Sequence, residues 1–206
     1  MKVVYTPAHL LHNPSVEIEK STTHSPFENI SRAEKIREVL SADPAFDFIS
    51  PTQWGTAPIN AVHDPGLLRF LTTAWSDYQR DVGAAPEVVP DMFYRPAQRR
   101  GMSQGQEPDS VTGKLGWWCF ETTTPLTSGT YEAARGAVDT ALTATQLVLS
   151  GDKYSYGLCR PPGHHATSSL YGGYCFFNNA AIAAHHIATT TGTKVAVLDV
   201  DSHHGN

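Results

Sequence analysis

Apolar and polar residues follow one another along this chain in a pattern that predicts strands alternating with helices. Short apolar runs at residues 3–5, 46–49 and 154–159 predict strands. The run at residues 194–200 is almost continuously apolar, which is typical of a parallel strand covered on both faces. Alternation of this kind indicates an α/β domain in which helices cover both faces of a parallel sheet.

Four segments show the apolar periodicity of a helix that packs one face inward, and they begin near residues 31, 64, 130 and 179. Each carries residues typical of helix ends. These are the capping box of Ser31 and Glu34, the pair Asp64–Pro65, the pair Thr130 and Gly151, and Gly192 near the last helix.

The periodic pattern is absent between residues 81 and 114, where prolines, glycines and charges follow one another. A loop of this length is either functional or mobile. It interrupts what otherwise reads as a single domain over residues 1–206. Its arginines Arg95, Arg99 and Arg100 fit a partner-binding cluster or, more simply, a solvated loop face, since exposed charges usually contribute little.

Composition agrees with one soluble α/β domain, because 206 residues that are 40% hydrophobic and 17% charged can bury a substantial core. We find no apolar run of membrane-spanning length and no signal peptide. The cysteines Cys119, Cys159 and Cys175 lack zinc-binding spacing and indicate reduced thiols in a cytoplasmic protein. The net charge of −5 disfavours nucleic acid and mildly favours cationic amines, although ordinary solubility explains it equally well.

Candidate chemistry follows the predicted last strand, which runs into Asp199, Asp201, His203 and His204. Ligands of open α/β sheets bind beyond the carboxyl ends of such strands. Carboxylates and imidazoles are costly to bury there unless they are paired or bind a metal. Asp201 and His203 are two residues apart and point to the same side of an extended chain, so they form half of a metal site. For His204 we expect no role as a ligand; its side chain packs or donates a hydrogen bond to the backbone.

A second segment, Cys-Arg-Pro-Pro-Gly-His-His-Ala at residues 159–166, presents a histidine pair on a rigid, non-helical turn. Histidine is the usual general acid or base near neutral pH. A lone pair such as His164 and His165 is more often solvated than catalytic. Together with a metal half-site, the pair predicts metal-assisted hydrolysis.

Both strings, in this order, resemble the signature of the histone deacetylase and arginase superfamily. Residues 1–5, 62–71, 74–75, 128–134 and 172–181 look most like bacterial acetylpolyamine amidohydrolases. The resemblance implies a three-layer arginase/deacetylase-like α/β fold, of which this chain is the N-terminal part. It also implies a metal-dependent amidohydrolase that removes acetyl groups from small cationic acetylated amines and releases acetate.

The resemblance assigns the catalytic roles by matched position. His165 matches the residue that takes the proton of the attacking water, and His164 matches its electrostatic partner. Asp199 matches the carboxylate that bonds His164, and Asn206 matches the residue that orients His165. A carboxylate favours the charged form of a histidine whereas an amide does not, so we expect a neutral His165 and a cationic His164.

The resemblance also implies the cation sites. Asp201 and His203 match two ligands of a divalent ion, and their oxygen and nitrogen donors suit zinc but also iron or manganese. Asp199 and neighbouring backbone oxygens match a structural monovalent site, occupied by potassium. Gly173 and Tyr174 match the wall of the acyl-chain tunnel.

Phe176 and Phe177, by contrast, read as core. Acids expected at the tunnel mouth are replaced here by threonines, so polyamine specificity is in doubt while amide hydrolysis is not. The residues concerned are Thr112 and Thr123 at the matched positions, Glu107 and Glu121 nearby, and Trp117 and Trp118 as alternative cation–π faces.

A third metal ligand and a catalytic tyrosine are implied for a region after residue 206. We therefore expect the chain, as a truncated domain, to be a poor catalyst by itself. The 81–114 loop is expected to narrow the active-site mouth and to pair two subunits as a homodimer. Two other readings stay open: a protein-lysine deacetylase that accepts peptides, and a non-catalytic metal-binding or interaction module.

Overall fold

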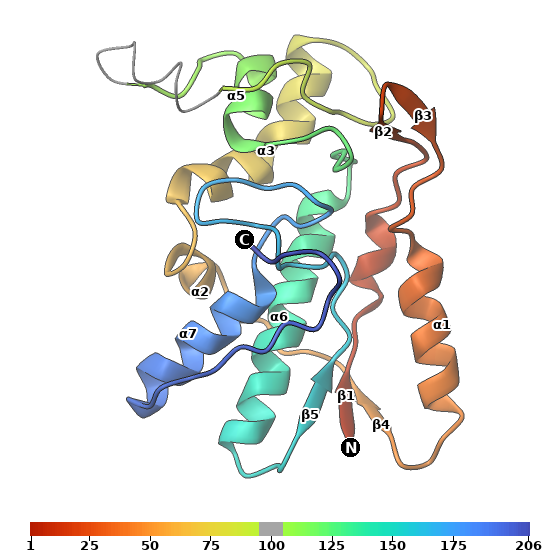
Figure 1. Ribbon diagram of the computed structural model, residues 1–206, viewed down its shortest axis with the longest axis vertical. Helices are drawn as coiled ribbons and strands as arrows, with labels where there is room; N and C mark the ends of the chain where they lie inside the picture. Colours follow the sequence, from red (N-terminus) through yellow and green to blue (C-terminus); the bar gives the residue numbers. More distant parts are fainter. Residues whose placement is uncertain (95–104) are drawn as a thin grey trace.

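The computed structural model describes residues 1–94 and 105–206, with the arrangement shown in Figure 1. The predicted arginine cluster of Arg95, Arg99 and Arg100 lies outside these residues. The central sheet has three parallel strands, β1 (Lys2–Val4), β4 (Asp47–Ile49) and β5 (Ser155–Gly157), in the order β4–β1–β5. These strands confirm three of the four predicted from apolar runs.

Helices cover both faces of this sheet, as predicted. The register places Val3 beside Phe48 and Tyr156, so the three side chains share one face. That face packs on Ala33 and Leu40 of α1 (Ile30–Ser41). The long helix α6 (Thr130–Leu149) contacts β1 and β5, and Figure 1 shows the strands between α6 and α1.

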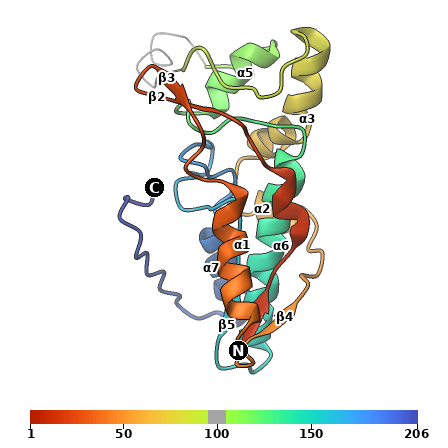
Figure 2. The same ribbon diagram turned by 90° about the vertical axis from the view of Figure 1, so that its right-hand side faces the viewer.

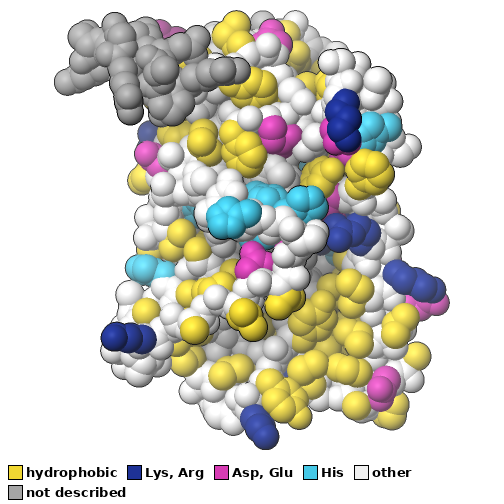
Figure 3. All heavy atoms as spheres, viewed as in Figure 1, with side chains coloured by type: hydrophobic (Ala, Val, Ile, Leu, Met, Phe, Trp, Pro, Cys, Tyr) yellow, Lys and Arg dark blue, Asp and Glu magenta, His cyan; other side chains and the backbone are white. Residues whose placement is uncertain are grey.

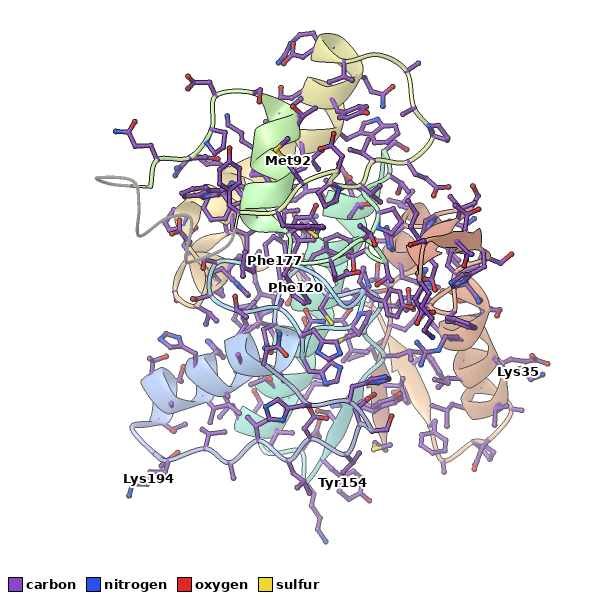
Figure 4. All side chains as sticks on the ribbon, turned by 45° about the horizontal axis from the view of Figure 1, so that its top comes forward. Lys35, Met92, Phe120, Tyr154, Phe177 and Lys194 are labelled. Atoms are coloured by element: carbon purple, nitrogen blue, oxygen red, sulfur yellow. The ribbon has the colours of Figure 1, made fainter. Side chains whose placement is uncertain are left out.

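The larger core lies between α3 (Pro65–Asp81), α5 (Val111–Trp118), α6 and α7 (Asn179–Thr191). Tyr171 stacks on Phe176 with 5.5 Å between ring centroids. Phe177 is 1% exposed and lies among the packed side chains at the centre of Figure 4, whereas Lys35 and Lys194 project outward. The prediction that Phe176 and Phe177 belong to the core is confirmed.

Two predicted helix caps are wrong by one or two residues, because the side chains of Ser31 and Thr130 bond other groups. The cap of α1 is Asn29, whose Oδ1 accepts hydrogen bonds from the N–H and hydroxyl of Ser31. The cap of α6 is Gly129, since the Thr130 hydroxyl bonds His12 and the Thr127 N–H instead. The contact between Thr130 and His12 is tertiary and leaves no local signal, whereas Asn29 is a local cap of a preferred residue type that the capping-box prediction overlooked.

The predicted 81–114 loop ends earlier than expected, because α5 begins at Val111. Ser110 caps this helix by accepting from the Gly113 N–H at 3.2 Å. The glycines Gly113 and Gly116 hide the helix from a propensity argument. They are required by contact, since a Cβ at Gly116 would lie 1.7 Å from the Met92 carbonyl oxygen.

The strand predicted at 194–200 is wrong: this segment has no regular structure. Strands require a ladder partner, and no strand in the described part of the chain pairs with it. Val197, Leu198 and Val200 are 60%, 87% and 87% exposed. Figure 2 shows the segment running along the outside of the molecule, away from the sheet. An apolar run reports a tendency to be buried, and the neighbours decide whether burial occurs.

Within the described residues, no helix combines the length and the apolar character needed to cross a bilayer. The three cysteines Cys119, Cys159 and Cys175 are all unpaired, as the spacing predicted.

Glu34 on α1 ties this helix to the N-terminal segment. Its carboxylate accepts two bonds from Arg37, one from the Tyr5 hydroxyl at 2.8 Å, and lies 3.0 Å from His9 Nε2. The Arg37 bonds, followed by those from Tyr5 and His9, lower the pKa of Glu34 to about 2. The ordinary value is 4.5, so the ionised form is favoured by folding.

We therefore predict that Glu34→Gln lowers the unfolding free energy by about 1 kcal/mol at neutral pH, a value discounted for solvent exposure. The stability from Glu34 is present above pH 4.5 and is lost as the pH falls toward 2, so the difference from wild type shrinks over that window. Urea denaturation from pH 2 to 7 measures this. Glu38→Gln, on the same helix and 68% exposed, is the control. A pH-independent difference would contradict the prediction.

Candidate active site

The histidine turn at residues 160–166 follows β5 and is held by a buried arginine. Arg160 is 3% exposed, and its Nε donates to Glu28 Oε1 at 2.9 Å. Its Nη1 donates to the carbonyl oxygens of His9 and His12, both at 2.7 Å. On the other side, Asn179 Nδ2 donates to the Pro161 carbonyl oxygen at 3.2 Å. The turn is thus fastened to the N-terminal segment and to α7.

The structure brings the predicted catalytic residues together. His164 Nδ1 lies 2.9 Å from Asp199 Oδ2, the partner that the resemblance implied. His165 Nδ1 lies 3.5 Å from Asn206 Oδ1, at the outer limit of a hydrogen bond. The Asn206 N–H also donates to the His164 carbonyl oxygen at 2.9 Å. The final segment is therefore seated on the histidine turn although it forms no strand.

Asp201 and His203 also point toward one another, as their spacing predicted. Asp201 Oδ1 accepts from the His203 N–H at 2.8 Å and lies 3.1 Å from His203 Nδ1. The N–H bond from His203 lowers the pKa of Asp201. The N–H of Asp201 donates to Asp199, and this bond, together with His164, lowers the pKa of Asp199. Both carboxylates are thus held ionised, which is the form that binds a cation.

This pair fits part of a divalent metal site. A carboxylate oxygen and an imidazole nitrogen are donors that zinc accepts. Within the described residues, no third His, Cys, Asp or Glu joins them to complete a cluster. Within the described residues, Asp201 and His203 are therefore the two side chains that would hold such an ion. His204 lines a neighbouring cavity on the other side of the final segment.

A cavity of about 700 Å³ opens beside these groups, and we call it the histidine cavity. On the face shown in Figure 3, histidine side chains gather with a carboxylate close by. The walls of the cavity come from the histidine turn, residues 173–174, the start of α1 and the final segment. The hairpin of β2 (Glu17–Glu19) and β3 (Thr22–His24) supplies a further part of the wall. The lining residues include His164, His165, Gly173, Tyr174, Asp201, His203, Glu19, Glu28, Arg32 and Thr123.

Gly173 and Tyr174, which the resemblance assigns to the wall of an acyl-chain tunnel, line the histidine cavity. Both have positive φ, 56° and 65°. A Cβ at Gly173 would lie 2.3 Å from Cδ2 of His165, so only glycine allows this close approach. The Tyr174 hydroxyl donates to Glu17 Oε1 at 3.1 Å, and burial, followed by the charge of Glu17, raises the pKa of Tyr174.

Glu121, Glu107 and Trp118, which were considered as replacements for the acids of the tunnel mouth, already have other contacts within the protein. The Glu121 carboxylate accepts from the N–H of Thr123, the hydroxyl of Thr124 and the N–H of Gly173. Glu107 accepts from the Trp118 indole at 2.8 Å and lines a different cavity. Trp118 is 5% exposed and is core, so it offers no open face to a cation.

Sequence reasoning missed the hairpin formed by β2 (Glu17–Glu19) and β3 (Thr22–His24), which supplies Glu17 and Glu19. The alternation of Glu17, Ile18 and Glu19 is too short to predict a strand. It also missed Glu28 as the partner of Arg160. The burial of Arg160 is visible only in the structure, so the sequence carried no signal that an acid lies beside it.

The histone deacetylase domain family matches residues 26–206 of the chain. The acetylpolyamine amidohydrolase of Mycoplana ramosa is 37% identical over 206 residues, covering 100% of this chain and 59% of that protein. Acetylpolyamine amidohydrolase 2 of Pseudomonas aeruginosa is also 37% identical, with 100% and 58% covered. The crystal structure of the acetylpolyamine aminohydrolase from Burkholderia pseudomallei has a TM-score of 0.82 and 30% identity over 92% of this chain and 53% of that one.

The α/β architecture and the paired histidine and aspartate segments define the arginase/deacetylase fold class. Within it, the chain belongs to the histone deacetylase domain family. It is similar to acetylpolyamine amidohydrolases from several bacteria, and it spans 59% of the length of the Mycoplana ramosa relative. These findings confirm the family and the fold inferred from the two sequence strings.

The contact between Gly173 and His165 generates a prediction. We expect Gly173→Ala to lower the unfolding free energy by about 2 kcal/mol and to shift the ring resonances of His165, because the new methyl group displaces that ring. NMR of the histidine rings and urea denaturation measure the two effects.

Gly192→Ala is the matched control, since Gly192 has φ 68° but nothing within 4 Å of an added Cβ. Gly192→Ala should lower the unfolding free energy by about 1 kcal/mol and leave the ring resonances of His165 unchanged. If both variants lowered the unfolding free energy equally and the His165 resonances did not shift, the close contact between Gly173 and His165 would have no consequence.

Proposed function

We propose that this chain carries the catalytic face of an amidohydrolase that removes acetyl groups from small acetylated amines and releases acetate. The observation that carries the proposal is the histidine cavity, which is lined by His164 and His165 together with Asp201 and His203. The relatives named as acetylpolyamine amidohydrolases support an acetylated polyamine as the substrate class.

Each histidine has a distinct environment in support of a distinct role. Nδ1 of His164 donates to Asp199, which fixes the orientation of the ring, so that Nε2 can donate to negative charge that develops in the cavity. Asn206 engages Nδ1 of His165 and adds no charge, which leaves Nε2 to take a proton from the attacking water. Tyr174 and Gly173 form the wall against which the acyl group lies.

A divalent cation held by Asp201 and His203, zinc or alternatively iron or manganese, would supply Lewis-acid polarisation of the acetamide carbonyl. The ionised carboxylates and the two donor atoms support this assignment. Asp199, with nearby backbone oxygens, remains our proposed ligand for a structural potassium ion. Because the chain contributes two divalent-ion donors, we expect its turnover to be slow.

The proposal also covers the cellular location, the charge of the substrate and the pairing of subunits. Three unpaired cysteines support a cytoplasmic location. The net charge of −5 supports a small cationic substrate rather than nucleic acid, and no membrane partner is proposed. Pairing of two subunits through residues 81–114 stays a prediction from the resemblance, as does a single catalytic domain over 1–206.

The hydrolytic role of His165 is tested by incubating the zinc-loaded protein with N-acetylputrescine and measuring acetate. We expect His165→Ala to lower kcat by about 10²-fold or more, since it removes a general base. His185→Ala is the control, because His185 is an exposed histidine of α7. Acetate release that survives His165→Ala would refute the assignment, and a preference for an acetyl-lysine peptide would favour a protein deacetylase.

Metal binding has a separate test. We expect calorimetric titration with Zn²⁺ to show one site that Asp201→Ala weakens more than tenfold, since a carboxylate donor is lost. Asp109→Ala, at an exposed aspartate outside the histidine cavity, should leave the affinity unchanged. Binding that ignores Asp201 would place the ion elsewhere. A zinc-binding protein without any acetate release would favour a non-catalytic metal-binding module.

A further inference from the structure

The β2–β3 hairpin presents one acidic face to the histidine cavity. Side chains two apart on a strand share a face, so Glu17 and Glu19 point the same way. The direction is given by Glu17, which accepts the hydroxyl of Tyr174 on the cavity wall. Glu19 itself lines the cavity. The hairpin therefore places a second carboxylate on the same wall as Tyr174.

The two carboxylates have different surroundings. Glu17 is 1% exposed and is committed to Tyr174, with His24 Nδ1 at 3.5 Å from the same oxygen. Glu19 has 39% of its side chain exposed and ends the strand beside a two-residue turn. Both turn residues, Lys20 and Ser21, have positive φ, 51° and 62°, the conformation of a tight hairpin turn. This turn sets the register that holds Glu19 at the cavity rim.

The other acids on this cavity have partners that a substrate cannot easily replace. Glu28 is 4% exposed and bonds the buried Arg160. Asp201 is the proposed metal ligand. Thr123 contributes no charge. Among the described residues that line the cavity, Glu19 is thus the acid accessible for binding a cation away from the metal ligands.

The existing partners of Glu19 are exchangeable. Lys20 Nζ lies 2.9 Å from Glu19 Oε1, but Lys20 is 84% exposed. His24 Nε2 lies 3.6 Å from the other oxygen. Ion pairs this exposed contribute little, so an incoming ammonium group can take the place of Lys20 at small cost. Arg32, 62% exposed, also lines the cavity and adds positive charge there, so the contact with a cation must be made locally at Glu19.

We propose that Glu19 is the specificity-determining residue that receives the free ammonium group of an acetylated diamine in the histidine cavity. It supplies the charge that Thr112 and Thr123 lack at the positions where an acid was expected. The inference rests on the proposed function for the orientation of the substrate, with the acetamide at the histidines and the ammonium at the hairpin.

The test is equilibrium binding, which does not depend on turnover. Calorimetry compares N-acetylputrescine with N-pentylacetamide, in which a methyl group replaces the ammonium. We expect the wild-type protein to bind the charged ligand three- to tenfold more tightly, and Glu19→Gln to abolish this difference while leaving the affinity for N-pentylacetamide unchanged. The preference should also shrink as NaCl is raised, because the contact is exposed to solvent.

Glu38→Gln is the matched control, because it removes the same charge from an exposed site on α1 outside the cavity. It should keep the wild-type preference. The inference is overturned if Glu19→Gln keeps the preference, if it weakens both ligands equally, or if the wild-type protein shows no preference. Glu19-dependent binding without any release of acetate would instead count against the proposed hydrolysis and leave the role of Glu19 intact.

Discussion

The buried Arg160 is the constraint on which the candidate site depends. A guanidinium that is 3% exposed must be compensated, and Glu28 together with the carbonyl oxygens of His9 and His12 provides that compensation. Removing one partner of such a pair leaves an uncompensated charge and costs about 3–5 kcal/mol. The bonds from Arg160 therefore hold the histidine turn against the N-terminal segment. This attachment fixes the position of the turn and so of His164 and His165.

The same N-terminal segment continues into the β2–β3 hairpin, whose Glu19 lines the cavity together with the histidine turn. Glu17 fixes the hydroxyl of Tyr174, while Glu121 fixes the N–H of Gly173. Two buried or engaged carboxylates thus shape the wall, and a third, Glu19, stays accessible. Acidic side chains thus have two roles near this site. Glu17 and Glu121 position the cavity wall, whereas Glu19 is the acid that is accessible to a ligand.

Much of the fold was predictable because its signals are local. Three apolar runs gave the strands of the central sheet, and Asp64 and Gly192 marked helix ends through capping chemistry that any helix requires. The starts at Ser31 and Thr130 were wrong because those hydroxyls bond Asn29 and His12, which are choices among competing partners. The run at 194–200 was wrong as a strand because a strand needs a neighbour with free N–H and C=O groups, and a sequence pattern carries no such information.

The sequence alone determined which chemistry is present: the His164–His165 pair on a proline-stiffened turn, the Asp201 and His203 donors, and the family to which these strings belong. Spacing along the chain suffices for the two pairs, because residues two or fewer apart have a limited choice of relative positions, whereas the family was implied by the resemblance of the two strings. Tertiary structure alone decided that Arg160 pairs with Glu28, that Glu121 is occupied, and that Glu19 faces the histidine cavity. The Arg160–Glu28 and Glu121–Gly173 bonds join residues 132 and 52 positions apart, and the position of Glu19 depends on the direction of a hairpin, so no local pattern contains them.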